Sequence, residues 1–464
     1  MPALWDPVNG RVLRFGGGGQ AQYAPLFQFT IADGWSQVTP SNLGPFNGRI
    51  GSGFVYDSQR NRMLVIGGGD WKGSTQSEVW ALSLDPVPAW TQISFAGTMP
   101  IRKDFTTIYD PIQDRVLLYA GTTSGGTATS DVWQLTLSGT PTWSQITPSG
   151  SPPPARYTHV AIFDPVRDRM IIDGGINSGG LRNDAWALSL SGTPTWSQIA
   201  APNGPAVFYS AAVYDPVRDR MAVITGVNAG NPDSTWFLSL KRTPFWTALP
   251  AGPVSVGPRY QHAAVYEPDL DLILAIGGTS GTGFVTDTRR LDCAGGFWLE
   301  AGASNGSVQV VPTKACYATD EHVTLVASPS GGAMFNQWLG DASGNANPLD
   351  VTMDASKTIF AEIVPRMTGV EDEPVAFAMS VHPNPSTGPI DIEYALPRAA
   401  SVRLMVYDVA GREVARLVDG SAPAGRHVAR WSALTGSARA HSGIYLARYE
   451  TPAGSWTRRI VVLK

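Results

Sequence analysis

The chain repeats itself at an almost constant interval, and this periodicity limits the folds that it can adopt. An aromatic residue followed by an acidic residue, usually with proline next, recurs six times. The acidic positions are Asp6, Asp57, Asp110, Asp164, Asp215 and Glu267, at intervals of 51, 53, 54, 51 and 52 residues. A unit of this length cannot bury its own apolar surface, so neighbouring copies must stack.

Each copy has the pattern of four short strands. A turn containing Asp or Asn follows the acidic position, and an apolar run ending in glycine follows the turn, as in residues 169–175. Tryptophans open the third segment at Trp80, Trp133, Trp186 and Trp236 and lie in the fourth at Trp35, Trp90, Trp143, Trp196 and Trp246. Strands of four to seven residues without a helical period predict an antiparallel meander. Six meanders stacked radially form a β-propeller.

The composition agrees with an all-β protein of several domains. The 50 glycines and 36 prolines among 464 residues disfavour long helices and favour strands joined by tight turns. A chain of this length exceeds what one hydrophobic core supports. We therefore predict a six-bladed propeller over residues 1–292, with seven blades as the alternative, followed by two small β-sandwich-like domains.

The period, the diglycines and the spaced aromatic residues resemble kelch repeats of the galactose-oxidase central-domain type. The resemblance covers residues 1–292 and implies a kelch-like propeller with a ligand site at its rim. Four copies carry arginine eight residues before the acidic position, and in the first copy that position falls before Met1. We therefore expect an upstream segment with a signal peptide and, as an open alternative, part of a further blade.

The pattern changes after the sixth copy. Residues 295–364, with Tyr317, Trp338 and Pro348 among their anchors, resemble a divergent internalin-type B-repeat. This resemblance implies a spacer or adhesion module without catalytic residues. Residues 365–376 contain three consecutive acidic residues and no apolar period, so they are predicted to be a linker.

Residues 377–464 form the last predicted domain. Ordered segments such as 402–412, 424–431 and 457–464 resemble the C-terminal sorting domain of type IX secretion cargo, which is similar to the immunoglobulin-like domain of flagellar-hook capping proteins. The resemblance implies type IX-like secretion machinery as a partner and a secreted or cell-surface location. Charge also divides the chain here, because residues 377–464 have 11 basic and 6 acidic side chains while the whole chain has net charge −4.

Candidate ligand contacts gather where the meanders place their post-glycine loops and first-strand entries on one rim. They are Arg49, Arg102, Arg156, Tyr157, Arg182, Arg259, Tyr260, Asp70, Trp71 and Lys72. Arginines on a rim suggest capture of an anion through bidentate hydrogen bonds. Asp70, Trp71 and Lys72 occupy no repeat position, and Trp71 is a candidate platform for sugar stacking, with packing on a neighbouring loop as the alternative.

The rim arginines also have a structural interpretation. Acidic residues stand two positions before the third-segment aromatic residue or its equivalent, at Glu78, Asp131, Asp184 and Asp287. In the fifth copy the arginine becomes Val207 and the acid becomes Ser234, so both are lost together. Paired loss is typical of an ion pair within each blade, and the sequence favours this interpretation.

Several other classes of function find little support. The two propeller histidines, His159 and His262, share one repeat position and are expected to be scaffold residues, so we predict no metal, cofactor or catalytic residue. The sequence has no basic face interleaved with aromatic residues, the pattern that favours nucleic-acid binding. The sequence contains no apolar run of 18 residues, so it predicts no membrane span. Cys293 and Cys316 fit either one disulfide or two buried thiols.

These patterns predict an exported, largely non-catalytic bacterial protein whose propeller rim binds an extracellular glycan or protein. The alternative is an extracellular carbohydrate-active enzyme, similar to a sugar mutarotase or lyase, that uses arginines and acids at the same rim. A third possibility is a structural surface-layer component without a small ligand.

Overall fold

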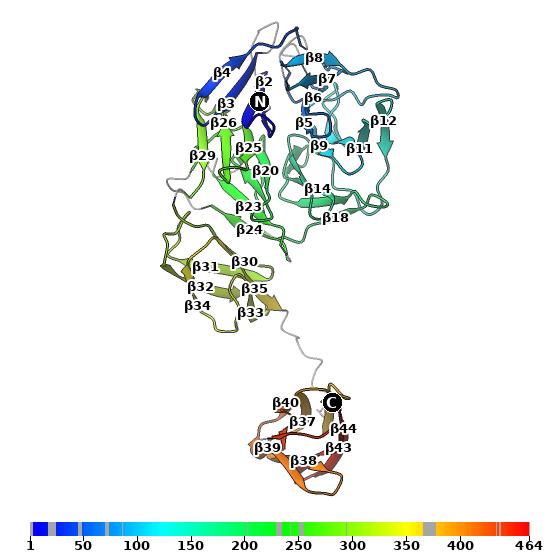
Figure 1. Ribbon diagram of the computed structural model, residues 1–464, viewed down its shortest axis with the longest axis vertical. Coiled ribbons are helices and arrows are strands. Elements are labelled where there is room, and N and C mark those ends of the chain that lie inside the picture. Colours follow the sequence, from blue (N-terminus) through cyan, green and yellow to red (C-terminus); the bar gives the residue numbers. More distant parts are fainter. Residues whose placement is uncertain are drawn as a thin grey trace. The chain divides into compact units, whose positions relative to one another are not determined.

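The computed structural model describes residues 3–16, 25–44, 49–69, 74–85, 87–201, 203–228, 234–241, 243–249, 255–293, 295–364, 377–432, 434–435 and 438–463. These residues form strands, turns and irregular segments (Figure 1), and the described part of the chain contains no helix long and apolar enough to cross a membrane. The chain divides into two compact units, Met1–Arg366 and Met367–Lys464. The predicted linker, residues 365–376, lies outside the described residues.

The first unit begins with six antiparallel sheets, each built from consecutive strands. Blades 1 to 3 consist of β1 (Ala3–Asp6), β2 (Arg11–Phe15), β3 (Leu26–Thr30) and β4 (Gly34–Val38); β5 (Gly53–Asp57), β6 (Arg62–Ile66), β7 (Val79–Ser83) and β8 (Ala89–Gln92); and β9 (Thr106–Asp110), β10 (Arg115–Thr122), β11 (Ala128–Thr136) and β12 (Thr142–Ile146). Blades 4 to 6 consist of β13 (Val160–Asp164), β14 (Arg169–Asp173), β17 (Ala185–Ser189) and β18 (Trp196–Gln198); β20 (Ala211–Asp215), β21 (Arg220–Ile224), β23 (Thr235–Ser239) and β24 (Phe245–Ala248); and β25 (Ala263–Glu267), β26 (Leu272–Ile276) and β29 (Thr288–Leu291).

The six first strands are innermost and form a closed ring. β1 contacts β5, β5 contacts β9, and the contacts continue through β13, β20 and β25 back to β1. The blades lie around this ring in Figure 1. The prediction of an all-β propeller is confirmed, and its ring has six blades.

The repeated acidic residue organises the turn between the first and second strands. In blade 4, the Asp164 carboxylate is fully buried and accepts hydrogen bonds from the amides of Val166 and Arg167. Arg169 Nε donates to the same carboxylate at 2.8 Å. Because a buried carboxylate needs both hydrogen bonds and an opposite charge, this network explains why the acid and the following arginine recur together.

A tryptophan lies between each blade and the preceding one. Trp90, Trp143, Trp196 and Trp246 pack between blades 1 and 2, 2 and 3, 3 and 4, and 4 and 5, while Trp35 packs between blades 6 and 1. The junction between blades 5 and 6 is filled by Trp298, which lies beside Phe237 and Leu291. In the described residues no fourth strand pairs with β29, so Trp298 supplies the sixth tryptophan without a blade strand.

After Trp298 the chain enters a six-stranded sandwich. One sheet has the order β30 (Leu299–Ala303), β35 (Lys357–Val364) and β33 (Met334–Gly340), and the other has the order β31 (Gly306–Val311), β32 (Glu321–Pro329) and β34 (Leu349–Met353). β30 and β35 run parallel, while the other pairs are antiparallel. The predicted boundary between residues 292 and 295 stays a prediction, because both sides lie in one compact unit.

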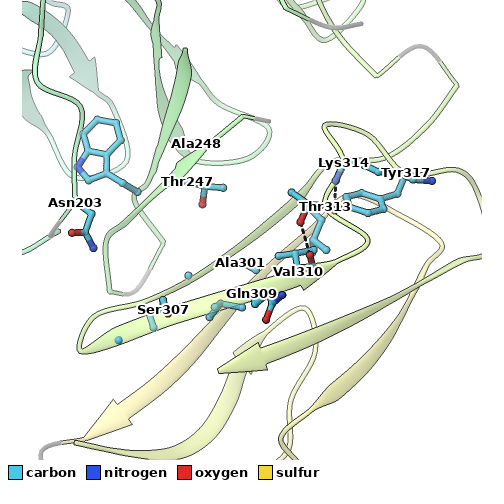
Figure 2. Close-up of a pocket in the computed structure, with 16 residues that line it drawn as sticks. Asn203, Thr247, Ala248, Ala301, Ser307, Gln309, Val310, Thr313, Lys314 and Tyr317 are labelled. Carbon is cyan, nitrogen blue, oxygen red and sulfur yellow. Dashed lines mark hydrogen bonds between the residues drawn. The ribbon is translucent and has the colours of Figure 1, made fainter. Parts of the chain in front are cut away.

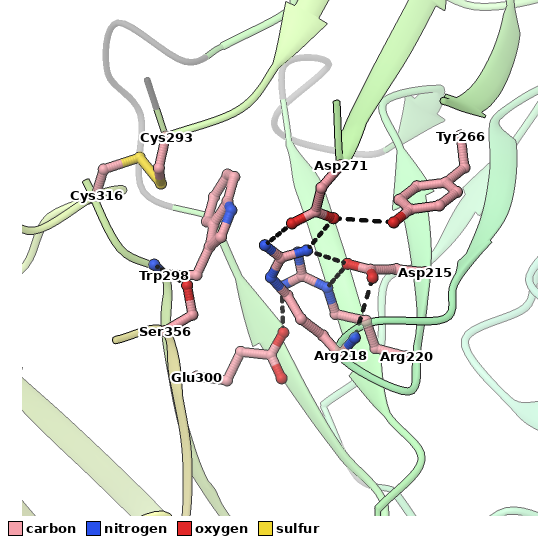
Figure 3. Close-up of polar contacts among 10 residues, drawn as sticks. All are labelled: Asp215, Arg218, Arg220, Tyr266, Asp271, Cys293, Trp298, Glu300, Cys316 and Ser356. Atoms are coloured by element: carbon pink, nitrogen blue, oxygen red, sulfur yellow. Dashed lines mark hydrogen bonds and ion pairs between the residues drawn. A yellow bond between two sulfur atoms is a disulfide. The ribbon is translucent and has the colours of Figure 1, made fainter. Parts of the chain in front are cut away.

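A buried arginine joins blade 5 to this sandwich (Figure 3). Arg220 donates to Asp215 in its own blade at 2.8 Å and forms an ion pair with Glu300 of β30, and both Arg220 and Glu300 are buried. Its guanidinium lies 3.7 Å from the ring centroid of Phe237. Cys293 and Cys316 form a disulfide across the same junction, which resolves the two alternatives left by the sequence.

The second unit is a sandwich of its own. Its sheets have the orders β36 (Ala378–His382), β37 (Ile390–Leu396), β40 (Gly425–Trp431), and β39 (Glu413–Ala422), β38 (Ala400–Asp408), β43 (Gly443–Thr451), β44 (Gly454–Val462), with a short pair β41 (Leu434–Thr435) and β42 (Ala438–Arg439). Ile392, Leu404, Trp431, Tyr449 and Ile460 lie in its core. Buried and exposed residues alternate along most of β43, whereas Leu404, Met405 and Val406 of β38 are buried in succession.

The tryptophan positions give a first prediction. Replacing Trp298 by alanine is expected to lower the free energy of unfolding of the first unit by about 3–5 kcal/mol, because it opens a cavity between blades 5 and 6. Trp246→Ala is the matched comparison, since Trp246 fills the neighbouring junction. Calorimetry of the full chain measures both. An unchanged unfolding temperature for Trp298→Ala, with a lowered one for Trp246→Ala, would show that Trp298 does not close the ring.

One buried carboxyl group departs from the repeat. Asp173 ends β14, where other blades have apolar side chains such as Ile66, Ile224 and Ile276. Both carboxyl oxygens are buried without a hydrogen-bond partner in the described residues. Burial raises the pKa of Asp173 well above its usual value, and the charge of Arg156 opposes this shift only in part.

Asp173 therefore predicts a pH-dependent cost. Because its pKa is higher in the folded state, the folded protein loses stability as pH rises from about 3.8 towards that folded pKa. Asp173→Ile is expected to raise the free energy of unfolding at pH 7 by about 1–3 kcal/mol and to give a smaller gain near pH 4. Asp173→Asn separates the titration from the change in size. Parallel stability-against-pH curves for wild type and both variants would contradict the argument.

Candidate functional site

A chain of four backbone hydrogen bonds links five blades at one mouth of the propeller axis. Its members lie six residues before each repeated acidic residue and just before the innermost strands, and they are Gly51, Asp104, Thr158, Tyr209 and Gln261. From Asp104 onwards, each amide donates to the carbonyl of the preceding member, at distances of 2.8, 2.9, 3.1 and 2.9 Å in chain order. We call these five residues the collar, which ties blades 2 to 6 together around the axis.

The collar residues adopt a backbone conformation that normally favours glycine. Their φ angles lie between 54° and 61°, in the left-handed region. Glycine occupies this position without strain in blade 2, yet blades 3 to 6 carry Asp104, Thr158, Tyr209 and Gln261. Non-glycine residues held in such conformations cluster at functional sites, where the role of the side chain offsets the cost of the strained backbone.

Three collar side chains and one neighbour interact at the mouth. Tyr209 and Gln261 form a side-chain hydrogen bond. Burial, then the proximity of Asp104 and Tyr157, raises the pKa of Tyr209. Burial also raises the pKa of Asp104, while Lys103 opposes this shift, and in the described residues no cation pairs with the Asp104 carboxylate. Burial therefore favours the neutral form of the Asp104 carboxyl group, and no ion pair among the described residues holds it in the charged form.

Aromatic residues stand next to the collar in blades 4 to 6. Tyr157, Phe208 and Tyr260 each precede a collar residue, and each pairs its backbone with the segment after the diglycine, or its equivalent, of its own blade. The rings of Phe208 and Tyr209 lie 5.2 Å apart. The seven residues that form what we call the mouth cluster are Lys103, Asp104, Tyr157, Phe208, Tyr209, Tyr260 and Gln261. The cluster contains four aromatic side chains and two charged ones, those of Lys103 and Asp104.

Glycine at the end of the second strand allows the rim loops to approach the mouth. Gly175 has φ of 88°, and a Cβ atom there would lie 2.8 Å from Cβ of His159 and 2.9 Å from the carbonyl oxygen of Tyr157. Any side chain would separate the loop from the start of the first strand. The diglycine is therefore a packing requirement of the mouth and not a nucleotide-binding motif.

The four rim arginines are paired with the four predicted acids. The ion-pair distances are 2.6 Å for Arg49–Glu78, 2.5 Å for Arg102–Asp131, 2.8 Å for Arg156–Asp184 and 2.8 Å for Arg259–Asp287. All four arginines are buried. The prediction of ion pairs within the blades is confirmed, and a role for these arginines in ligand contact stays a prediction.

The acid of each pair is held by more than the arginine. Asp184 also accepts a hydrogen bond from Trp186 Nε1 at 2.7 Å, and Trp80 and Trp133 donate to Glu78 and Asp131 in the same manner. Burial alone would raise the pKa of Asp184, but the hydrogen bonds and the charge of Arg156 lower it below its usual value. This network accounts for the tryptophan that opens the third strand.

The remaining predicted residues have different positions. Arg182 is half-buried and donates to Asn177 Oδ1 at 2.8 Å within the post-glycine loop of blade 4. Asp70, Trp71 and Lys72 lie outside the described residues, so the proposed sugar platform at Trp71 stays a prediction. The collar side chains of Asp104, Tyr209 and Gln261 were missed by the sequence analysis, although their variability within a regular repeat is a signal that could have found them.

The two propeller histidines are buried beside the first strands. His159 Nε2 lies 2.7 Å from Thr106 Oγ1, and burial lowers the pKa of both His159 and His262, to about 3 for the latter. Both imidazoles therefore stay neutral at physiological pH. Among the described residues, no group of three or more His, Cys, Asp and Glu side chains is placed to hold a metal ion.

Three family models match successive parts of the chain. Residues 60–278 match the KLHDC2/KLHL20/DRC7 Kelch-repeats domain. The first part of the chain is a kelch-repeat propeller. Residues 299–363 match the divergent InlB B-repeat domain, and residues 380–463 match the secretion system C-terminal sorting domain. All three resemblances derived from the sequence are confirmed, and the six-stranded sandwich is hereafter the B-repeat sandwich.

Known proteins match part of the chain at low identity. The chain is 27% identical over 278 residues to serine/threonine-protein phosphatase BSL2 of Arabidopsis thaliana, covering 54% of this chain and 27% of that protein. It is 29% identical over 187 residues to putative adagio-like protein 2 of Oryza sativa subsp. japonica, covering 36% of this chain and 29% of that protein. The chain thus spans less than a third of each curated relative. A solved structure of YjhT has a TM-score of 0.48 at 12% identity, covering 70% of this chain and 96% of that one.

The arginine pairs of the kelch propeller yield a further prediction. Arg156→Ala is expected to lower the free energy of unfolding by about 3–5 kcal/mol, because it leaves Asp184 without its cation. The double variant Arg156→Val/Asp184→Ser copies blade 5, which has Val207 and Ser234, and should recover most of the loss. Denaturation in urea measures both.

The pH dependence provides a control for that comparison. Since the folded-state pKa of Asp184 is lowered, its stabilisation is present at neutral pH and is lost as pH falls through that pKa. The double variant should lose less stability on acidification than wild type. A double variant as unstable as Arg156→Ala would show that the arginine acts through packing and not through the ion pair.

Proposed function

We propose that this protein binds an extracellular glycan at the mouth cluster of its propeller. The kelch propeller and the sorting domain together indicate a secreted or cell-surface protein with a binding-type propeller, handled by the secretion machinery through its C-terminal domain. The observation that carries the finer proposal is the collar, where strained positions carry an aspartate, a tyrosine and a glutamine that contact or lie near one another.

The chemistry of the mouth cluster suits a sugar. Aromatic faces such as Tyr157 and Tyr260 stack on the apolar face of a pyranose ring, while carboxylate and amide groups bond its hydroxyls. The Asp104 carboxyl group, which has no ion-pair partner among the described residues, can accept hydrogen bonds from the hydroxyls or amines of neutral and amino sugars. An extracellular protein partner is the competing occupant of the same mouth.

The enzyme alternative depended on free arginines and acids at the rim. Those arginines form ion pairs with the acids of their own blades, and this pairing weakens both the enzyme hypothesis and the capture of an anion by the arginines. A binding role at the mouth cluster requires neither group. We therefore propose binding and not catalysis.

The proposal is tested by titrating the full chain with neutral, amino and uronic oligosaccharides and following its unfolding temperature. A ligand at about 100 times its dissociation constant adds roughly 2.7 kcal/mol, which raises that temperature by a few degrees. Tyr209→Ala and Asp104→Asn are each expected to weaken binding at least about tenfold, equivalent to about 1.4 kcal/mol. Calorimetric titration then gives the affinities.

Two controls make the result decisive. Gln59→Ala changes an exposed residue in the turn at the opposite end of blade 2 and should leave binding unchanged. Arg156→Ala should lower stability without abolishing binding. A ligand whose affinity is unaffected by Tyr209→Ala and Asp104→Asn would place binding elsewhere, and binding of acidic peptides instead of sugars would favour a protein partner.

A further inference from the structure

A short hairpin stands beside the mouth cluster in blade 6. It is formed by β27 (Thr279–Ser280) and β28 (Gly283–Phe284), and β27 also pairs with Tyr260 of the mouth cluster. Phe284 is the most exposed large apolar side chain in the described part of the chain, with 81% of its surface accessible. A single exposed ring needs no explanation, but this one has a fixed relation to the mouth cluster.

Backbone pairing places Phe284 in one row with Tyr260. Tyr260 and Thr279 exchange two backbone hydrogen bonds of 2.9 Å, and Thr279 pairs in turn with Phe284. Directly opposed residues of antiparallel strands have their side chains on the same face of the sheet. Their Cα atoms are about 5.5 Å apart in a hydrogen-bonded pair and about 4.5 Å apart in the other kind. The two aromatic residues are therefore separated by roughly 10 Å, with a hydroxyl group between them.

The hairpin is held in place by its own hydrogen bonds. The Val285 amide donates to the Gly278 carbonyl at 3.0 Å, and the Ser280 hydroxyl lies 3.0 Å from that of Thr282 in the turn. A Cβ atom at Gly278 would lie 2.9 Å from the Tyr260 carbonyl oxygen, so glycine is required for the close approach of the hairpin to the first strand. The row is thus formed before a ligand binds, which avoids the entropic cost of ordering it.

The chemistry of the hairpin is neutral and rich in hydroxyl groups. Residues 277–286 contain four serine or threonine side chains and no charged one. All of them belong to the segment 255–293, which the structure describes without a gap. An acidic peptide or a nucleic acid would require cations at such a surface, whereas aromatic rings that flank a hydroxyl group suit a neutral sugar chain.

Blade 4 has the same row without the outer aromatic ring. Tyr157 pairs with Ile176, and Ile176 pairs with Leu181 across the hairpin of β15 (Ile176–Asn177) and β16 (Gly180–Leu181). Leu181 is half-buried, whereas Phe284 is exposed. The hairpin thus forms with leucine at this position, so its fold does not require the exposed phenylalanine of blade 6.

The pocket between blade 5 and the B-repeat sandwich does not offer such a surface (Figure 2). It encloses about 340 Å³ beside β24, β30 and β31, and the two aromatic residues in its lining, Trp246 and Tyr317, are buried. Stacking on a sugar requires an accessible ring face. The row of blade 6 meets this requirement and the pocket does not.

We propose that the ligand of the mouth cluster is a linear oligosaccharide that extends outwards over blade 6, with one sugar ring stacked on Tyr260 and a later ring stacked on Phe284. This inference rests on the proposed binding of a glycan at the mouth cluster. The separation of roughly 10 Å exceeds the width of one pyranose ring, so only a chain of sugars covers both aromatic residues. The Thr279 hydroxyl is placed to bond the units between them. Phe284 then determines a preference for chain length.

Calorimetric titration of the full chain with two probe series, cello-oligosaccharides and N-acetylglucosamine oligomers of increasing length, tests this preference. In the series that binds, affinity should rise at least about tenfold from the monosaccharide to the tetrasaccharide. Phe284→Ala should remove this gain and leave the affinity for the monosaccharide unchanged, while Phe284→Trp should retain it because indole also offers a stacking face. Leu181→Ala, at the equivalent position of blade 4, is the matched control and should bind as wild type does.

The outcomes separate this inference from the proposed function. Sugar binding that Tyr209→Ala weakens, but that neither chain length nor Phe284→Ala alters, would overturn the extended site and leave the glycan site in place. Failure of both series to bind at millimolar concentration would overturn the extended site, and the wider sugar panel would then decide the proposed function. Binding of acidic peptides in place of sugars, lost in Phe284→Ala, would assign the row to a protein partner and overturn the inference.

Discussion

The propeller depends on the packing of each blade against the next, because its ring is closed without a strand shared between the first and last blades. β1 contacts β25, and Trp35 of blade 1 donates a hydrogen bond to Thr288 of blade 6 at 2.8 Å, yet β1 and β25 belong to separate sheets. Side-chain packing at six junctions must therefore supply the closure that backbone pairing does not. Tryptophan suits these junctions because one residue buries a large apolar area.

The sixth junction shows how this constraint links the propeller to the B-repeat sandwich. Trp298 fills the space between blades 5 and 6, and two residues later Glu300 pairs with Arg220 of blade 5. In blades 1 and 3 the equivalent arginines, Arg11 and Arg115, donate instead to glutamines of the third strand. Phe237 stands at that position in blade 5, so the sandwich supplies the acceptor that the blade lacks. The sandwich is thus part of the structure that stabilises the ring.

Much of the fold could be predicted because the same residue types recur in the turns, strands and loops of successive copies. The buried acid, the arginine five residues later and the diglycine recur at fixed spacing, so the pattern of one copy helps to predict the structure of the others. The rim ion pairs were predictable for the same reason, since Val207 and Ser234 replace both partners in one copy. Trp298 was not assigned to the ring, because it follows a segment that departs from the repeat. It fills the junction beside blade 6, which has no fourth strand in the described residues.

The collar was missed for the opposite reason. Its backbone conformation is constant, but its side chains change from Gly51 to Asp104, Thr158, Tyr209 and Gln261, so no recurring residue type marks the position. Residues that recur in every copy of a repeat protein are those that stabilise it. Residues that vary at a position of constant backbone conformation are those that can distinguish one ligand from another. The arginines belong to the first class and the collar to the second. A search for binding residues in such a propeller should therefore begin with strained positions that do not repeat.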